Sequence, residues 1–165
     1  MAANTKQDNL IAWLRDAHAM EAATTDNLER LIGRADDYSQ LKSQLQRHLE
    51  ISRRQREEVE QQLKKLGSDT STLKDLAMRF TGWMQPFLGA LAPDEMPKHC
   101  LAAHAWENFE VASYRSMLGA AQELGMGDLQ QMCERFIREE QEMAQFLFDQ
   151  LPQITRQYLQ RLPTG

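Results

Sequence analysis

Long segments without helix-breaking residues constrain the fold of this 165-residue chain more than any other feature. Its eight glycines and five prolines fall mostly at a few junctions. Between these junctions, apolar residues recur at intervals of three and four, which is the spacing of one face of an α-helix. No segment of useful length alternates apolar and polar residues as a half-buried strand does. The chain is therefore predicted to be all-α.

The junctions predict two long helices in the first part of the chain. The first runs from about residue 4 to residue 34, with Asn4 or Thr5 as its N-cap. The second ends just before Gly67, a residue type that suits a helix C-terminus. Residues 67–97 contain short apolar patches punctuated by glycine and proline, so we expect one or two short helices in a crossover.

Two more long helices follow this segment. The third begins near Pro97 and ends at Gly125. The fourth starts at a capping-box-like Asp128 and is predicted to end before Pro152, which leaves a short helix or tail over residues 152–165. Four long helices with one lengthy central connection predict a single-domain four-helix bundle with a crossover between the second and third helices.

Composition narrows the class of partner and compartment. The net charge of −5 argues against nucleic acid or an anionic membrane as the main partner. The start of the chain, MAANTKQDNL, has no apolar signal core, and no apolar run reaches membrane-spanning length. Two cysteines form no disulfide framework and lack metal-ligand spacing. We expect a cytoplasmic protein.

Acidic side chains interrupt the apolar faces of three predicted helices. Counting about 100° per residue, Glu21 falls in the apolar stripe of the first helix. Glu110 lies at the centre of the third helix's stripe with Glu107 at its flank, and Glu140 lies within the stripe of the fourth. Each acid is near the middle of its helix, so the acids are expected to point inward at one level of the bundle.

The second helix supplies a polar counterpart at the same depth. Its inward seam is apolar at both ends and polar in the middle, where His48 and Gln55 lie. Tyr114 shares a face with Glu110 and is either a hydrogen-bond donor to the acids or an ordinary core tyrosine. The other histidines, His18 and His104 among them, are expected at flanks or on the surface, as is His99.

A metal ion would compensate such a group of buried acids. Taken alone, each glutamate on an apolar stripe is more often partly exposed or paired with a basic residue. Several buried carboxylates together must be paired, protonated or bound to a cation, because burying an unpartnered charge is very costly. Oxygen-rich sites with an occasional imidazole suit iron or manganese. The candidate metal ligands are Glu21, His48, Glu107, Glu110 and Glu140, with Gln55 and Tyr114 as supporting residues.

Four sequence stretches resemble the YciE/YciF type of ferritin-like protein. They are LRDAHAMEAA, HLEISRRQ, ENFEVASYRSMLGAAQELG and EEQEMAQFL, one in each predicted helix. The resemblance covers roughly residues 10–151. It implies a ferritin-like four-helix bundle, often dimeric and linked to bacterial stress responses, with Glu21, Glu107, Glu110 and Glu140 in ligand-like positions. The exposed helical faces and the aromatic segment FTGWMQPFLG fit the expectation of a homodimer.

Two positions depart from that pattern. Ile51 stands three residues after His48, where the family pattern has a glutamate, and Met143 stands where a histidine would complete a Glu-x-x-His pair with Glu140. About four or five ligands remain for a site that usually has about six. Two hypotheses stay open: a complete or partial di-metal site with iron or peroxide chemistry, and a non-catalytic bundle with a vestigial site that acts through dimerisation or a protein partner. No reaction can be assigned from the sequence.

Overall fold

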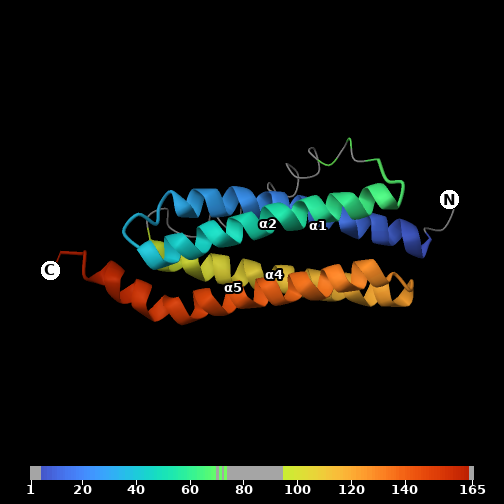
Figure 1. Ribbon diagram of the computed structural model, residues 1–165. Helices are drawn as coiled ribbons and strands as arrows, with labels where there is room; N and C mark the ends of the chain where they lie inside the picture. The colour runs from blue at the N-terminus through green and yellow to red at the C-terminus, as the bar shows by residue number, and fades with distance from the viewer. Residues whose placement is uncertain (1–4, 70, 72, 74–94, 164–165) are drawn as a thin grey trace.

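Four long α-helices make up the computed structural model, which describes residues 5–69, 71, 73 and 95–163 (Figure 1). Their bounds are α1 Lys6–Ile32, α2 Ser39–Lys65, α4 Met96–Glu123 and α5 Gly127–Leu159. The described residues contain no strand. The predicted all-α four-helix bundle is confirmed.

The helices are arranged as two antiparallel pairs packed face to face. Helix α1 pairs with α2, and α4 pairs with α5 (Figure 1). Helices α2 and α4 run in the same direction, so the end of α2 and the start of α4 lie at opposite ends of the bundle (Figure 1). This is the topology of a bundle with a crossover after its second helix. The short helices expected in that connection fall largely on residues 74–94, outside the described part of the chain.

Local sequence explains several helix ends. Thr5 is the N-cap of α1 and forms a capping box with Asp8, whose backbone N–H donates to Thr5 Oγ1 at 3.1 Å. Gly67 and Gly125 follow α2 and α4 with φ values of 70° and 65°, a left-handed conformation that favours glycine. The predicted cap at Thr5 and the two predicted glycine stops are confirmed.

The predicted end of the fourth helix before Pro152 is wrong, because α5 continues through this proline to Leu159. Proline removes one backbone hydrogen bond of the helix. Tertiary contacts hold the next turns in place: Ile154 is buried in an apolar cluster, and Gln157 Nε2 donates to the backbone oxygen of Asp37 at 2.7 Å. Packing therefore outweighs the local preference for a break.

The predicted capping role of Asp128 is also wrong. The N-cap of α5 is Met126, and no side chain makes a capping hydrogen bond there. Asp128 lies in the first helical turn, where its carboxylate faces Lys65 Nζ of α2 at 3.5 Å. A carboxylate in the first turn still complements the helix dipole.

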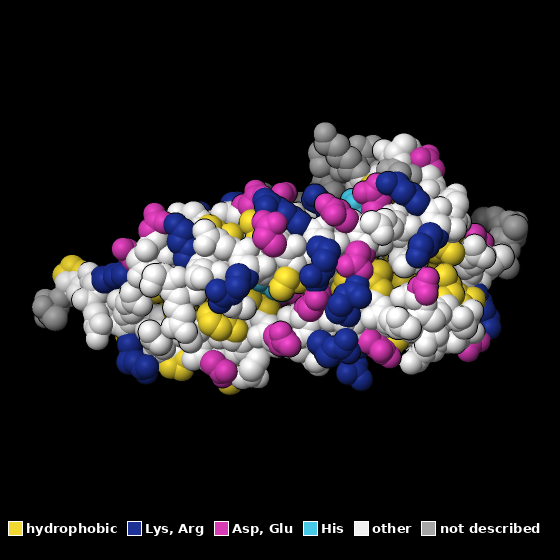
Figure 2. All heavy atoms as spheres, in the orientation of Figure 1, with side chains coloured by type: hydrophobic (Ala, Val, Ile, Leu, Met, Phe, Trp, Pro, Cys, Tyr) yellow, Lys and Arg dark blue, Asp and Glu magenta, His cyan; other side chains and the backbone are white. Residues whose placement is uncertain are grey.

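Charged side chains of both signs are interspersed over the visible face of the molecule (Figure 2). Ion pairs also join neighbouring helices; one between Arg53 Nη2 and Glu29 Oε1 at 2.7 Å links α1 and α2. Exposed pairs of this kind contribute little stability individually. The helices are therefore held together mainly by their buried faces.

Two apolar clusters fill the bundle interior. One gathers residues such as Leu14, Val59 and Phe136 toward the α4–α5 turn. The other gathers residues such as Leu45 and Leu147 toward the α1–α2 turn. Buried polar residues from all four helices complete the core: Glu21, Thr24, Thr25, His48, Ser52, Gln55, Glu107, Glu110 and Glu140.

Candidate metal centre

An imidazole from α2 lies between two carboxylates from the opposite helix pair. His48 Nε2 is 3.0 Å from Glu107 Oε2 and 3.2 Å from Glu140 Oε2. The single Nε2–H can be directed at one oxygen, and its hydrogen bond is with Glu107. All three side chains are buried, and one potential ligand atom from each lies within 4.8 Å of the others. The three residues therefore form a compact group of one nitrogen and two oxygen donors.

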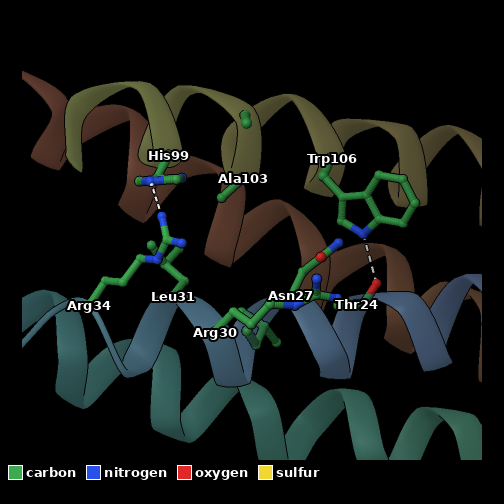
Figure 3. Close-up of a pocket in the computed structure, with 10 residues that line it drawn as sticks. Thr24, Asn27, Arg30, Leu31, Arg34, His99, Ala103 and Trp106 are labelled. Atoms are coloured by element: carbon green, nitrogen blue, oxygen red, sulfur yellow. Dashed lines mark hydrogen bonds between the residues drawn. The ribbon is translucent and has the colours of Figure 1, made fainter. Parts of the chain in front are cut away.

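We call the buried polar side chains Glu21, His48, Gln55, Glu107, Glu110 and Glu140 the buried layer. Two further carboxylates of this layer are each fixed by a hydroxyl group. Tyr114 donates to Glu21 Oε1, and Thr24 Oγ1 lies 2.5 Å from Glu110 Oε1 and donates to it. Trp106 Nε1 in turn donates to Thr24 Oγ1 at 2.7 Å (Figure 3). In each of these two glutamates, one carboxylate oxygen accepts a hydrogen bond and the other has no hydrogen-bond partner among the described residues.

Buried oxygens without a hydrogen-bond partner are the most unusual feature of the layer. Five buried side-chain oxygens have no hydrogen-bond partner among the described residues: Glu21 Oε2, Gln55 Oε1, Glu110 Oε2 and both carboxylate oxygens of Glu140. A buried polar atom without a partner costs about 1–3 kcal/mol, and more when it is charged. The bundle thus concentrates several unfavourable groups at one depth, where a cation would compensate them.

Burial and mutual repulsion keep protons on these acids. Burial and the charge of Glu140 raise the pKa of Glu21 well above its usual value, and burial and the charge of Glu21 do the same to the pKa of Glu110. Burial raises the pKa of Glu107 to about 7, although His48 opposes this change. Without a cation, the layer is expected to hold at least two protons on carboxylates at neutral pH.

His48 and Glu140 carry the opposite charges of the layer. Burial disfavours the imidazolium, but Glu107 and Glu140 outweigh that effect and raise the pKa of His48 well above 6.5. Burial also opposes the charge of Glu140, yet the neighbouring His48 lowers the pKa of this carboxyl below 4.5. One imidazolium cannot neutralise four carboxylates, so protons or metal ions must do the rest.

The structure buries all of the site residues predicted from the sequence, namely Glu21, His48, Gln55, Glu107, Glu110, Tyr114 and Glu140. Tyr114 does donate a hydrogen bond to the acids, and its acceptor is Glu21 on the facing helix. Gln55 donates its amide N–H to Glu139 Oε2 at 2.9 Å, which leaves its oxygen as one of the unpartnered atoms. Both side chains therefore occupy supporting positions.

The other histidines lie apart from this group. His104 Nδ1 is 2.9 Å from the backbone oxygen of Ala144. His99 Nε2 is 2.9 Å from Arg34 Nη1 (Figure 3). His18 Nε2 is 4.0 Å from Glu60. These positions agree with the prediction that the three histidines lie at flanks or on the surface.

Sequence reasoning missed the polar support around the acids. Thr24 is not among the residues predicted for the site, yet its hydroxyl connects Trp106 to Glu110. Ser52 is fully buried, and its hydroxyl donates to the backbone oxygen of His48 at 3.2 Å. A short hydroxyl residue at a core position is the signal that could have revealed both.

The two departures from the family pattern have different surroundings. Met143 is 1% exposed and belongs to the apolar cluster beside the layer. Ile51 is only partly buried. Neither residue offers an oxygen or nitrogen ligand, so the donors come from the four glutamates, His48 and Gln55.

Fold and site define the class of protein: an all-α four-helix bundle with a buried histidine and carboxylate group that can hold a metal ion. The chain belongs to the DUF892 family, a domain of unknown function, whose family model matches residues 5–160. No helix of the described chain is long and apolar enough to cross a membrane.

Two solved bacterial structures are similar to this chain. A protein of Xanthomonas campestris pv. campestris shares 27% sequence identity with a TM-score of 0.80, over 96% of this chain and 98% of that protein. YcfI, a proposed structural protein of Rhodopseudomonas palustris, also shares 27% identity, with a TM-score of 0.70 over 88% of this chain and 94% of its own. The likeness supports the fold over nearly the whole chain.

Proposed function

We propose that this protein is a bacterial, stress-associated ferritin-like protein of the YciE/YciF type, and that it binds two iron or manganese ions in the buried polar layer. The observation that carries the proposal is the set of five unpartnered buried oxygens beside a single imidazole. Carboxylate oxygens with one imidazole nitrogen suit these metals. We also propose a cytoplasmic location, which suits the free and buried state of both Cys100 and Cys133.

The side chains would divide the work of such a centre. Glu21, His48, Glu107, Glu110 and Glu140 would hold the ions. The donors Tyr114 and Thr24 fix the orientation of Glu21 and Glu110, and the flanking apolar clusters exclude bulk water. A bound iron pair would supply the capacity to reduce oxygen or peroxide. No particular reaction is assigned.

Elemental analysis of the protein, purified without added metal or chelator, tests the proposal. We expect iron or manganese to copurify with the wild type and to be largely lost from Glu140→Gln, because neither oxygen of Glu140 makes a hydrogen bond and its Oε2 lies only 3.2 Å from His48 Nε2. The matched control is Glu142→Gln, an exposed glutamate two residues along α5. A metal-free wild type that also fails to take up Fe²⁺ or Mn²⁺ would overturn the proposal.

A second candidate function is a non-catalytic bundle with a vestigial site. Met143, buried in the apolar cluster where a histidine would complete the family pattern, favours it. In that case Glu21 and Glu110 remain protonated, and the protein acts through dimerisation or a protein partner. The copurified metal content separates the two functions.

We also propose that the protein forms a homodimer. Trp13 and Phe109 are 45% and 40% exposed, and they line a hollow of about 450 Å³ between α1 and α4 together with Met20 and Met117. Exposed aromatic residues around an apolar hollow are typical of interaction surfaces. The aromatic segment FTGWMQPFLG, which motivated the same expectation, lies outside the described residues.

Light scattering over a wide concentration range checks the dimer. We expect a dimer for the wild type and weaker association for Phe109→Ser, because this change removes exposed apolar area from the rim of the hollow. The control is Phe148→Ser, which changes a 57% exposed phenylalanine on α5, away from the hollow. A monomer at every concentration would contradict the proposal.

A further inference from the structure

A second hollow, of about 200 Å³, lies between α1 and α4 and shares no lining residue with the hollow proposed for the dimer. Its α1 wall includes Asn27 and Leu31, and its α4 wall includes Ala103 and Trp106 (Figure 3). A cavity of about 150 Å³ is enough to hold a benzene molecule. The hollow therefore has room for a small ligand built on one ring.

The inner surface of this hollow is mainly apolar. Leu28, Leu31, Ala102 and Trp106 line it and are all buried. Trp106 Nε1 already donates to Thr24 Oγ1 at 2.7 Å (Figure 3). With its single N–H satisfied, the indole offers a ligand aromatic surface rather than a hydrogen bond. Aromatic rings pack well against such a surface in offset or edge-to-face arrangements.

The rim of the hollow is positively charged. Arg30 and Arg34 lie one turn apart on α1, and both are exposed. None of the described residues that line the hollow is acidic. Because like charges one helical turn apart destabilise a helix, an anion bound beside the two arginines would be favoured.

His99 faces this arginine pair from α4. Its Nε2 lies 2.9 Å from Arg34 Nη1 (Figure 3). A guanidinium group can only donate hydrogen bonds, so His99 Nε2 accepts and the ring is neutral, with its proton on Nδ1. The contact turns Arg34 toward α4 and does not cancel its charge.

Two polar side chains of α1 can serve a ligand directly. Arg30 donates through Nε to the backbone oxygen of Asp26 at 3.1 Å, and it forms no ion pair with a carboxylate in the described part of the chain. The amide of Asn27 points toward α4 (Figure 3) and makes no hydrogen bond to a described residue. A carboxylate accepts hydrogen bonds from guanidinium and amide groups of this kind.

We propose that this hollow binds a small aromatic carboxylate. The ring of the ligand lies against Trp106 and Leu31. Its carboxylate accepts hydrogen bonds from Arg30 and Asn27, and the charge of Arg34 adds to the attraction. The proposal goes beyond the metal centre and does not depend on a bound ion, because none of these five residues is a proposed metal ligand.

Titration of the full-length protein with benzoate tests this site. The indole N–H signal of Trp106 is followed in a nitrogen–proton correlation spectrum, where it is assigned by its absence from Trp106→Phe. We expect a saturable shift of this signal with a Kd of about 1 mM or tighter. Benzyl alcohol has the ring without the charge, and acetate has the charge without the ring. Each should bind at least about tenfold more weakly than benzoate.

Matched variants assign the binding to the hollow. Arg30→Gln should weaken benzoate binding about tenfold. The control is Arg47→Gln, which removes the charge of an exposed arginine on α2 that does not line the hollow. Ala103→Leu fills the hollow with apolar atoms and should abolish binding. Ala103 is only partly buried, so the Tm of this variant should stay close to that of the wild type.

Each contrary result overturns the proposal. A Trp106 signal that benzoate does not shift in a saturable way would show that the hollow takes no such ligand. Equal binding by Arg30→Gln and Arg47→Gln, or benzyl alcohol binding as tightly as benzoate, would rule out recognition of a carboxylate. Benzoate binding that persists in Ala103→Leu would place the ligand elsewhere on the protein.

Discussion

At the scale of single residues, the carboxyl groups proposed to bind metal are the ones that stay protonated when no metal is bound. The folded-state pKa values of Glu21 and Glu110 lie well above the unfolded value near 4.5, and that of Glu107 is about 7. The folded apo protein therefore holds more protons than the unfolded chain between pH 4.5 and about 7. Stability from such groups is complete below the unfolded pKa and is lost as the pH rises.

This linkage predicts that the stability of the apo protein falls as the pH rises, while its affinity for metal increases. The Tm of the apo protein should fall between pH 5 and pH 8, since His48, whose pKa is also raised, contributes with the same sign. Glu140 has a lowered pKa, so its contribution is lost only below about 4.5. Metal binding releases the stored protons, so Mn²⁺ affinity should rise over the same interval. Thermal melts and calorimetry at several pH values measure both trends. An apo Tm that rises with pH would contradict the assigned protonation.

The tyrosine at the acids gives a prediction for one hydrogen bond. Tyr114→Phe leaves Glu21 Oε1 without its donor, so chemical unfolding should show a loss of about 1–3 kcal/mol. The remaining carboxylate would be less well oriented, and Mn²⁺ affinity should fall about 10–100-fold. Tyr158→Phe, a partly buried position near the end of α5, serves as the control. Unchanged metal affinity in Tyr114→Phe would remove the tyrosine from the metal centre.

At the scale of elements, the sequence predicted helices and their turns better than it predicted the limits of α5. Thr5 and the two glycines act through their own backbone conformation, which is local and readable from the sequence. Pro152 also has a strong local preference for a break, but Ile154 belongs to an apolar cluster that includes Tyr38 and Leu41. Gln157 donates to Asp37 in the turn between α1 and α2, and these residues lie far away in sequence. Such contacts depend on how the helices pack, so the sequence alone could not predict them. The same is true of the hydrogen bond from Tyr114 to Glu21, which joins two different helices.

Pro152 should therefore cost stability that an alanine would restore. Pro152→Ala returns one backbone hydrogen bond and removes a steric clash, effects worth up to about 3 kcal/mol in a helix interior. The more flexible unfolded chain offsets about 0.4–1 kcal/mol of this gain. We expect urea unfolding to show a net gain of about 2 kcal/mol, against a change within about 0.5 kcal/mol for the exposed neighbour Gln153→Ala. A destabilised Pro152→Ala would mean that the proline itself is required at that turn.

At the scale of the whole molecule, the buried layer links the two helix pairs. Helices α1 and α2 contribute Glu21 and His48, and α4 and α5 contribute Glu110, Glu107 and Glu140. The periodicity of the sequence was sufficient to place these acids inside, because each lies on an apolar stripe. It could not show which oxygens remain unpartnered, since that depends on the relative rotation of four helices. A metal ion bound here would join both helix pairs, so metal binding should raise the free energy of unfolding of the whole bundle.

The substitution Ile51→Glu uses this link to choose between a partial and a vestigial site. Ile51 lies one helical turn after His48 and is partly buried, so a longer acidic side chain has room to reach either the layer or solvent. If the layer binds metal, the added carboxylate should increase affinity for Fe²⁺ or Mn²⁺. A 100-fold gain would correspond to about 2.7 kcal/mol of additional stability at saturating metal. If the site is vestigial, the same change should lower stability by about 1–3 kcal/mol with or without metal. Thermal melts of both proteins with and without Mn²⁺ separate these outcomes, and Gln61→Glu is the control because this side chain is exposed on the same helix. An Ile51→Glu variant that is destabilised and that no metal restores would support the vestigial site. The buried glutamates would then serve only in core packing, and the protein would act through dimerisation or a protein partner.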